Sequence, residues 1–509
     1  MNSANPFLIC LNDADNVAVA RVALCVGQNI FLGGKFITVR NPIAAGHKLA
    51  LESIAVGQPV LKYGQIIGLS TLDIQAGDHV HQHNVAMLSS QPDHGVGKKF
   101  HPTAIEAVTA SFEGIVRADG RVGTRNYLGV ISSVNCSATV CRHIAQSIQE
   151  STLRAYPNVD GVVAITHGSG CGMSGAGEAL ELLRRTLRGY ADHPNFAGVL
   201  LVGLGCEVNQ LAPLVKTLGR RDPALFATLT IQDEGGTRET IDAGVAILQD
   251  MLPIADRKIR TTVSAKHLTV GLQCGGSDGY SGISANPALG AAVDLLVRNG
   301  GTAILSETPE IYGAEHLLTA RAANSEVAEK LMSRVRWWEA YTHKHGGNMN
   351  NNPSPGNQAG GITTILEKSL GAVAKAGSGG LMAVYEYAQP VHVHGLVFMD
   401  TPGYDPVSAT GQVAGGANLI CFTTGRGSTY GCKPTPSLKL ATHTALFKRM
   451  SMDMDFDCGG IVDGHMTIAQ AGERLFDLML STASGQRTKS ELHGLGDNEF
   501  LPWQLGAVM

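Results

Sequence analysis

The sequence of 509 residues has no long hydrophobic run and no concentration of positive charge. A membrane-spanning helix needs roughly 18 or more consecutive apolar residues, and no such stretch occurs in the chain. The opening residues, MNSANPFLICLNDADN, lack the basic and then apolar segments of a secretory signal. With 39 Lys and Arg against 43 Asp and Glu, there is no basic stripe that would neutralise nucleic-acid phosphates. We therefore expect a cytoplasmic protein that binds neither membranes nor nucleic acids.

The ten cysteines lack the dense, regular spacing of small disulfide-rich secreted proteins. Their distribution predicts free thiols in a reducing compartment, where they are available for metal binding or for chemistry. Glycine, by contrast, is abundant, with 62 of the 509 residues, well above its usual share of about 7%. Because glycine allows the backbone to approach another group closely, we expect many tight loops.

The pattern of apolar residues divides the chain into three domains and a linker. Residues 1–92 contain short β-type runs, such as FITVRN, PVLKYG and HVHQHN, between glycine-rich turns, which is typical of a small β domain. Residues 93–113 are polar and poorly periodic, which predicts a linker. Strand-like runs then alternate with helical patterns in residues 114–262 and again in residues 263–509. This alternation indicates two α/β domains with mostly parallel sheets.

Four cysteines closely follow predicted strands, namely Cys136, Cys171, Cys206 and Cys274. The carboxyl ends of parallel strands meet at one edge of a sheet, where ligands bind. Thiolate sulfur selects zinc, ferrous iron or iron–sulfur clusters over Mg²⁺ and Ca²⁺. Unpaired cysteine is also often a small buried apolar residue, and these spacings match no compact zinc or ferredoxin pattern. As a set, the four cysteines favour a metal-binding function.

Other predicted strand ends carry charged side chains: Glu307 and Glu310 in SETPE, Asp400 and Asp405 in DTPGYD, and Arg426 in TTGRG. The planar guanidinium of Arg426 can bind a carboxylate through two parallel hydrogen bonds, although an interdomain ion pair is an alternative use. The turn NNPSPGN, residues 351–357, can bind hydroxyl groups through its amides or cap a helix.

The N-terminal domain contains a group of histidines, His47 in GHK and His79, His81 and His83 in HVHQHN. Alternate residues of a strand point the same way, so the last three are predicted to share one face. Imidazole exchanges protons near neutral pH and is a common ligand of borderline metals. A solvated, histidine-rich edge strand is the alternative.

The motifs GHK, HVHQHN, DGRVGTRN, GLGCE, QCGGSDGYSGISANP, NPSPGN, EKSLG and TGRG together resemble those of the altronate and galactarate dehydratase family, over nearly the whole chain. The resemblance implies a first domain of the SAF type followed by the two α/β domains. It also implies a metal-assisted dehydration of a small sugar acid to a 2-keto-3-deoxy sugar acid, with Fe²⁺ as the first candidate metal and Mn²⁺ as the second. We expect the protein to form a homo-oligomer, with a dimer as the expected state. The motif GDHVHQHN favours the altronate branch of the family.

On this resemblance, each candidate residue receives an expected role. The proton-transfer candidates are His47, His81, His83 and His167, and the substrate-binding candidates are Arg125, Asn126, Ser277, Asp278, Asn286, Glu307, Asn357, Lys368 and Arg426. Cys274 is expected to face the metal, while the glycines of its loop let backbone amides approach the substrate. The histidines of the first domain are expected to reach into the crevice of the α/β part.

One position departs from the family pattern. Members of the family carry His-x-Tyr-Gly-Cys, whereas this chain reads His167-Gly168-Ser169-Gly170-Cys171. The absent tyrosine leaves the substrate open among altronate, galactarate, other aldonates or aldarates, and the sulfolactate of related sulfo-lyases. Two other classes of function remain open as well. An iron–sulfur redox protein would show a visible-absorbing cluster, and a sugar-acid sensor would bind its ligand without turnover.

Overall fold

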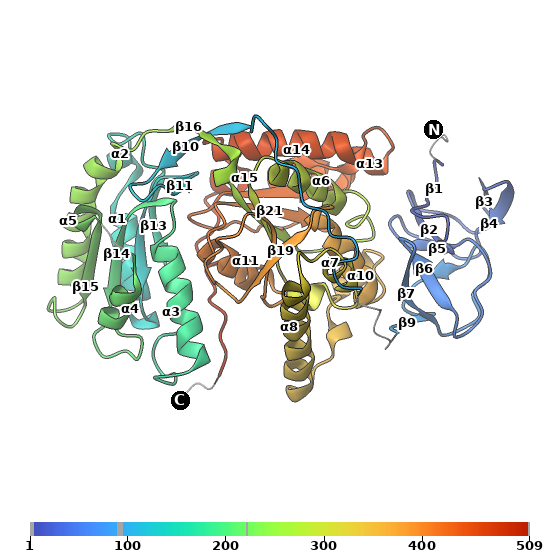
Figure 1. The fold of residues 1–509 in the computed structure, drawn as a ribbon, viewed down its shortest axis with the longest axis horizontal. Helices are drawn as coiled ribbons and strands as arrows, with labels where there is room; N and C mark the ends of the chain where they lie inside the picture. Colours follow the sequence, from blue (N-terminus) through green and yellow to red (C-terminus); the bar gives the residue numbers. More distant parts are fainter. Residues whose placement is uncertain (1–4, 89–94, 220–221, 507–509) are drawn as a thin grey trace.

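The computed structural model describes residues 5–88, 95–219 and 222–506. Figure 1 shows an N-terminal β domain at one end, a central α/β domain at the other, and a larger C-terminal α/β domain between them. The predicted fold class, a β-rich first domain followed by two α/β domains, is confirmed. Among the described helices, none combines the length and the apolar character that a membrane crossing requires.

The N-terminal domain consists of short antiparallel strands in sheets of order β1-β2-β5-β8, β3-β4 and β6-β7-β9. Its strands are β1 (Leu8–Ile9), β2 (Val17–Ala20), β3 (Asn29–Leu32), β4 (Lys35–Thr38), β5 (Lys48–Ala50), β6 (Pro59–Lys62), β7 (Gln65–Ser70), β8 (His79–Val80) and β9 (Val85–Ala86). Glycine-containing turns connect them. At Gly77, with φ of +90°, a Cβ would lie 2.0 Å from the carbonyl oxygen of Thr38, so this turn requires glycine.

The segment after the N-terminal domain runs along the C-terminal domain before it enters the central one. The predicted boundary after residue 92 lies outside the described residues. Residues 95–110 contain neither helix nor strand. The backbone N–H groups of Gly97 and Glu106 donate to the carbonyl oxygens of Thr319 and Arg298. These contacts hold the predicted linker against the C-terminal domain (Figure 1).

The central domain is built around a parallel sheet of order β13-β12-β14-β15. Its parallel strands are β12 (Tyr127–Ser132), β13 (Gly161–Ile165), β14 (Phe196–Gly203) and β15 (Phe226–Thr230), with helices α1 (Ala138–Ser147), α2 (Glu150–Leu153), α3 (Glu178–Ala191), α4 (Leu211–Thr217) and α5 (Thr237–Ala255). A small antiparallel sheet of β10 (Ser111–Val116), β11 (Val122–Gly123) and β16 (Thr261–Ser264) adjoins it. The alternation of strands and helices therefore gives the parallel sheet that the sequence predicts.

The C-terminal domain contains a seven-stranded parallel sheet of order β19-β20-β18-β17-β21-β22-β23. Its strands are β17 (Thr269–Cys274), β18 (Thr302–Leu305), β19 (Leu381–Tyr385), β20 (Gly395–Met399), β21 (Leu419–Thr424), β22 (Ser437–Ala441) and β23 (Phe456–Asp457). Its helices are α6 (Ala285–Arg298), α7 (His316–Thr319), α8 (Ser325–Lys344), α9 (Pro355–Ala359), α10 (Ile365–Val373), α11 (Asp405–Ala414), α12 (Thr444–Arg449), α13 (Gly459–Val462), α14 (Ile468–Ala483) and α15 (Lys489–Leu492).

The order of strands in this sheet identifies where a ligand is expected. From β17 the chain first continues to β18 on one side and later returns to β21 on the other side. In open parallel sheets, such a reversal leaves a crevice outside the carboxyl ends of the strands involved. The loop that begins at Cys274, directly after β17, lies at this position.

Candidate active site

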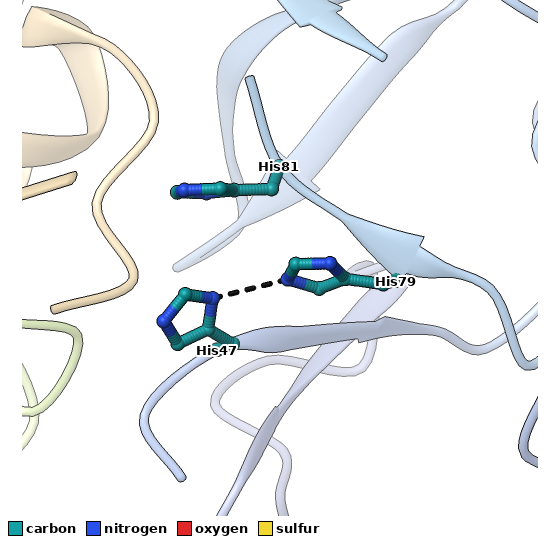
Figure 2. Close-up of side chains that lie close together, drawn as sticks. All are labelled: His47, His79 and His81. Atoms are coloured by element: carbon teal, nitrogen blue, oxygen red, sulfur yellow. Dashed lines mark hydrogen bonds between the residues drawn. The ribbon is translucent and has the colours of Figure 1, made fainter. Parts of the chain in front are cut away.

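Three histidine side chains of the N-terminal domain lie close together (Figure 2). The antiparallel pairing of β5 with β8 sets Lys48 opposite Val80 and therefore brings His47, just before β5, next to His81. The ring centroids of His47 and His81 are 5.0 Å apart. Nδ1 of His47 lies 3.0 Å from Nε2 of His79. The strand register thus brings His47 to His79 and His81, which lie more than 30 positions further along the chain.

The predicted shared strand face of His81 and His83 is wrong, because β8 ends at Val80. Residues 81–84 form a turn instead, in which the backbone N–H of His81 donates to Oδ1 of Asn84. His83 is exposed and is not part of the group of three, although its ring lies 5.4 Å from that of His79. The site therefore uses His79 where the sequence predicts His83.

Burial lowers the pKa of all three imidazoles and so favours their neutral form. Burial, followed by the neighbouring imidazoles, lowers the pKa of His79 to about 3. Burial and the charge of Lys48 lower the pKa of His81 to about 4, and burial lowers the pKa of His47. Nδ1 of His81 is buried and has no hydrogen-bond partner among the described residues. A buried, unpaired ring nitrogen is costly unless a ligand satisfies it.

The histidine group faces the C-terminal domain, with Nε2 of His47 3.2 Å from the carbonyl oxygen of Ala359. One glycine of the 274–280 loop, Gly279, lies at this contact between the domains. A Cβ at Gly279 would lie 1.9 Å from the carbonyl oxygen of Gly46. The hydroxyl of Tyr280 donates to the carbonyl oxygen of Ala20. Glycine at position 279 thus allows the N-terminal domain to dock directly on the loop.

A buried ion network connects the same two domains. Glu367 of α10 lies 2.9 Å from Nζ of Lys48 and 2.8 Å from Nζ of Lys62. Its carboxylate also accepts a hydrogen bond from the backbone N–H of Thr363. Although burial alone would raise it, the two lysines hold the pKa of Glu367 well below its usual range. The network fixes β5, and hence His47, against the C-terminal domain.

A second group of potential ligands surrounds Cys274 at the end of β17. Its members with donor atoms within 4.8 Å of one another are Cys274, Glu307 and Glu310, all of them buried. Two lysine ammonium groups already contact them. Nζ of Lys375, in the 3₁₀ turn Ala374–Ala376, lies 2.8 Å from Sγ of Cys274, and Nζ of Lys368 lies 2.7 Å from Oε1 of Glu310.

The surroundings shift the pKa values of the nearby acids in different directions. Burial and the nearby Glu310 raise the pKa of Glu307 well above its usual value. Against the effect of burial, Lys368 and Lys375 hold the pKa of Glu310 below its usual value. Burial and Glu310 raise the pKa of Asp405, at the start of α11, to about 7. A carboxyl group with this pKa can take up or release a proton at neutral pH.

Of the two groups, the histidines fit a divalent metal better. Metal-binding imidazole must be neutral, and His47, His79 and His81 meet this requirement with one buried nitrogen unpaired. The acids around Cys274 are instead already balanced by two ammonium groups, and burial raises the pKa of the thiol to about 12. Nitrogen ligands suit iron and zinc among other transition metals.

The predicted substrate residues Asp278 and Arg426 lie on adjacent loops. The backbone N–H of Arg426 donates to the carbonyl oxygen of Gly276, while its side chain is exposed. Asp278 is buried, accepts hydrogen bonds from the hydroxyls of Ser281 and Thr442, and has a pKa raised by burial. Arg426 is therefore free to meet a carboxylate at the carboxyl edge of the sheet, whereas Asp278 stabilises the loop.

Arg125 is a structural residue and not the predicted substrate-binding one. Its Nε and Nη2 donate to the two carboxylate oxygens of Glu491, 366 positions away. The remaining guanidinium N–H groups donate to the carbonyl oxygens of Thr124, Thr482 and Gln486. All five donors are thus used within the protein, and the side chain joins the central domain to the end of the C-terminal domain.

Five other predicted residues also have structural partners. The side-chain amides of Asn126, Asn286 and Asn357 donate to the carbonyl oxygens of Ala255, Gly371 and Ser277, in that order. His167, predicted to transfer protons, is buried, and burial lowers its pKa to about 4. Its Nε2 contacts the carbonyl oxygen of Ser132, and its Nδ1 accepts from the backbone N–H of Ser169. Ser277 is buried and contributes its carbonyl oxygen to Asn357.

The four predicted metal-binding cysteines do not form one group. Cys274 lies buried at the end of β17 in the C-terminal domain, whereas Cys136, Cys171 and Cys206 are exposed on loops of the central domain. Parallel strands place their ends together only within one sheet, and Cys274 stands in the second of the two α/β domains, apart from the other three cysteines.

The sequence does not predict a site role for three residues. They are His79, as a member of the histidine triad, Glu367 and Lys375. A signal for Lys375 exists, because it is the only charged residue of the run LGAVAKAG and a charge in an apolar run is costly to bury without a partner. Glu367 stands in the quoted motif EKSLG, but its partners Lys48 and Lys62 lie about 300 positions away along the chain.

Models of three protein-family domains match the chain in order. They are described as the altronate/galactarate dehydratase SAF domain for residues 6–88, the second domain of D-galactarate dehydratase/altronate hydrolase for residues 114–256, and the C-terminal domain of D-galactarate/altronate dehydratase for residues 265–508. Together these matches span most of the chain, in agreement with the motifs in its sequence.

Curated relatives match over nearly their full length. Altronate dehydratase of Escherichia coli (strain K12) is 37% identical over 95% of this chain and 96% of its own. Altronate dehydratase of Bacillus subtilis (strain 168) is 35% identical over the same shares. Galactarate dehydratase (L-threo-forming) of E. coli (strain K12) is 37% identical over 96% of this chain and 95% of its own. The chain therefore belongs to the altronate/galactarate dehydratase family of hydro-lyases.

Proposed function

We propose that this chain is a metal-dependent hydro-lyase that converts a sugar acid into a 2-keto-3-deoxy sugar acid, with D-altronate as the first substrate to test. Two of its relatives are named altronate dehydratases, and a third is named a galactarate dehydratase. The observation that carries the proposal is the group of three imidazoles beside the C-terminal domain, where His47 contacts Ala359 and Gly46 packs on Gly279. Asp405, whose pKa is about 7, adjoins the same loop at Gly275.

The reaction removes the proton at C2 and the hydroxyl at C3, so that the net loss is one molecule of water. The C2 proton beside a carboxylate is weakly acidic, so the site must stabilise the enediolate that forms. In this proposal Arg426 binds the substrate carboxylate through its planar fork, and Asp405 takes the C2 proton. Lys368, or Glu307, whose pKa is raised by burial and by Glu310, protonates the departing C3 hydroxyl. The resulting enol then relaxes to the ketone.

His47, His79 and His81 are the residues that would hold the metal. A bound Fe²⁺ or Mn²⁺ supplies Lewis-acid stabilisation of the negative charge on the enediolate. The Lys48–Glu367–Lys62 network fixes the N-terminal domain, and therefore the three imidazoles, over the 274–280 loop. Removal of that network is expected to disturb the site without any change in the imidazoles themselves.

The substrate is best decided by direct assay. Purified protein is incubated anaerobically with Fe²⁺ and, separately, with D-altronate, galactarate, other aldonates and sulfolactate, and 2-keto acid release is measured, with sulfite as the second product for sulfolactate. We expect turnover of D-altronate above the others. Turnover of galactarate alone would replace the substrate within the same proposal. Ligand binding without turnover of any sugar acid would contradict it and favour a sensor.

A further inference from the structure

We propose that Cys136, Cys171 and Cys206 together bind an iron–sulfur cluster on the central domain. These cysteines follow β12, β13 and β14, which are direct neighbours in the parallel sheet, with β12 in the middle. Their loops therefore leave the same edge of one sheet, next to α1, α3 and α4 (Figure 1). This arrangement lies on a different sheet from Cys274 and from the histidine group.

Hydrogen bonds tie the three cysteine loops to one another within a few residues of each thiol. The backbone N–H of Asn135 donates to the carbonyl oxygen of Ser169, at 2.9 Å. The backbone N–H of Asn209 donates to the carbonyl oxygen of Gly170, at 3.0 Å. These bonds connect the residue before Cys136 with the loop of Cys171, and the loop of Cys206 with the residue before Cys171.

A buried carboxylate and a close glycine contact hold the loops further. The hydroxyl of Ser133 donates to Oε1 of Glu207, at 2.8 Å, and Oε2 of Glu207 accepts from the backbone N–H of Gly205. Gly170 has a φ of +96°, and a Cβ there would lie 2.5 Å from the carbonyl oxygen of Ser133. Only glycine allows the loop of Cys171 to approach β12 so closely.

The three thiols are exposed, although their loops are held by buried groups. Cysteine is among the most frequently buried residue types, and five of the ten cysteines here are buried. The two other exposed cysteines, Cys10 and Cys25, belong to the N-terminal domain. Three exposed thiols at the edge of one sheet, on loops with fixed positions, are therefore better explained by a ligand than by packing.

The spacing favours a cluster over a single ion. With Zn–S bonds of about 2.3 Å in a tetrahedron, the sulfur atoms around one zinc lie roughly 3.8 Å apart. In the described parts of the chain, the groups of three or more donor atoms within 4.8 Å of one another do not include these cysteines. A cluster takes one thiolate on each of several irons and so spans more widely separated sulfurs. Three cysteines leave at least one iron of a four-iron cluster without a cysteine ligand.

The test loads the full-length protein anaerobically with Fe²⁺, Fe³⁺ and sulfide, removes the excess, and measures bound iron, bound inorganic sulfide and visible absorption. We expect iron and sulfide in similar amounts in the wild type and in the matched control Cys25→Ser. Each of Cys136→Ala, Cys171→Ala and Cys206→Ala should lose most of both. Iron bound without sulfide, or full loading of a variant with all three changes, would overturn the proposal.

A second measurement needs no variant. Alkylation of the wild type, with and without loading, is read by peptide mass spectrometry. Loading should protect Cys136, Cys171 and Cys206, while Cys10 and Cys25 remain reactive. Equal alkylation before and after loading, or disulfides among the three residues in the protein as isolated anaerobically, would overturn the inference. Neither readout depends on turnover, so the result is independent of the proposed dehydration.

Discussion

Nζ of Lys48 lies 2.9 Å from the carboxylate of Glu367 across the boundary between the N-terminal and C-terminal domains, and both side chains are almost fully buried. Lys62 contacts the other carboxylate oxygen. Removal of one partner from a buried ion pair leaves an uncompensated charge, which typically costs about 3–5 kcal/mol. Glu367→Gln should therefore lower the free energy of unfolding by about this amount, measured by urea unfolding.

The matched control for this prediction is an exposed ion pair. Arg238 and Asp242 lie 3.2 Å apart on α5 with side chains that are 83% and 66% exposed. Asp242→Asn should change stability by no more than about 0.5 kcal/mol. In Glu367→Gln, limited proteolysis should also release the N-terminal domain first. Equal stability of the two variants would show that the network does not hold the domains together.

The histidine triad predicts that turnover depends on His79 and His81 and not on His83, whereas the spacing in the sequence pairs His81 with His83. His79→Ala and His81→Ala should each lower kcat on the order of 100-fold or more, because each ring belongs to the group of three. His83→Ala and Gln82→Ala should be mild, since both side chains are exposed outside that group. Steady-state kinetics on D-altronate, with melting temperatures as a check of folding, measures the difference. A large loss of kcat in His83→Ala alone would show that His83, and not the triad, takes part in turnover.

Metal dependence is tested with Mn²⁺, which binds nitrogen and oxygen ligands and does not favour thiolates. Chelator treatment should abolish turnover, and Mn²⁺ or Fe²⁺ should restore it. Elemental analysis should show Mn²⁺ in the wild type and in Cys274→Ser, but much less in His81→Ala. Retention of Mn²⁺ by His81→Ala together with its loss in Cys274→Ser would move the metal to the buried group around Cys274.

The fold is largely predictable because its signals are local. Alternating strand and helix patterns correctly indicate the parallel sheets, and residues at strand ends, such as Cys274, Glu307 and Arg426, lie at the carboxyl edge as expected. The periodicity fails after Val80, where the two-residue strand β8 ends and the side chain of Asn84 stabilises a turn that contains His83.

Long-range pairing explains the other differences. Arg125 stands in a motif that fits a substrate-binding role, but its partner Glu491 is 366 positions away. No local sequence pattern reveals that all five N–H donors of its guanidinium group are bound within the protein. The separation of Cys274 from the other three cysteines, by contrast, follows from the predicted division into two α/β domains, because each domain forms its own parallel sheet.

Arg426 is expected to bind the substrate carboxylate because its side chain is exposed while its backbone is fixed to Gly276. Arg426→Lys retains the charge but loses the planar fork, so binding should weaken by about 1–3 kcal/mol, seen mainly as a higher KM. Arg238→Lys, a change of an exposed arginine on α5, is the control. Unchanged KM in a folded Arg426→Lys would mean that this residue does not bind substrate.

Asp405 is expected to act as the general base, which makes turnover depend on pH. Burial and Glu310 raise the pKa of Asp405 to about 7, so below this pH an increasing fraction of the carboxyl groups carries a proton and cannot accept another. The value of kcat should therefore fall about tenfold per pH unit below about pH 7. Glu310→Gln removes a negative charge that raises this pKa, so the acid limb should move to lower pH. Asp405→Asn should lower kcat by about 100-fold or more with little change in KM. An acid limb that stays in place in Glu310→Gln would assign the titration to another group.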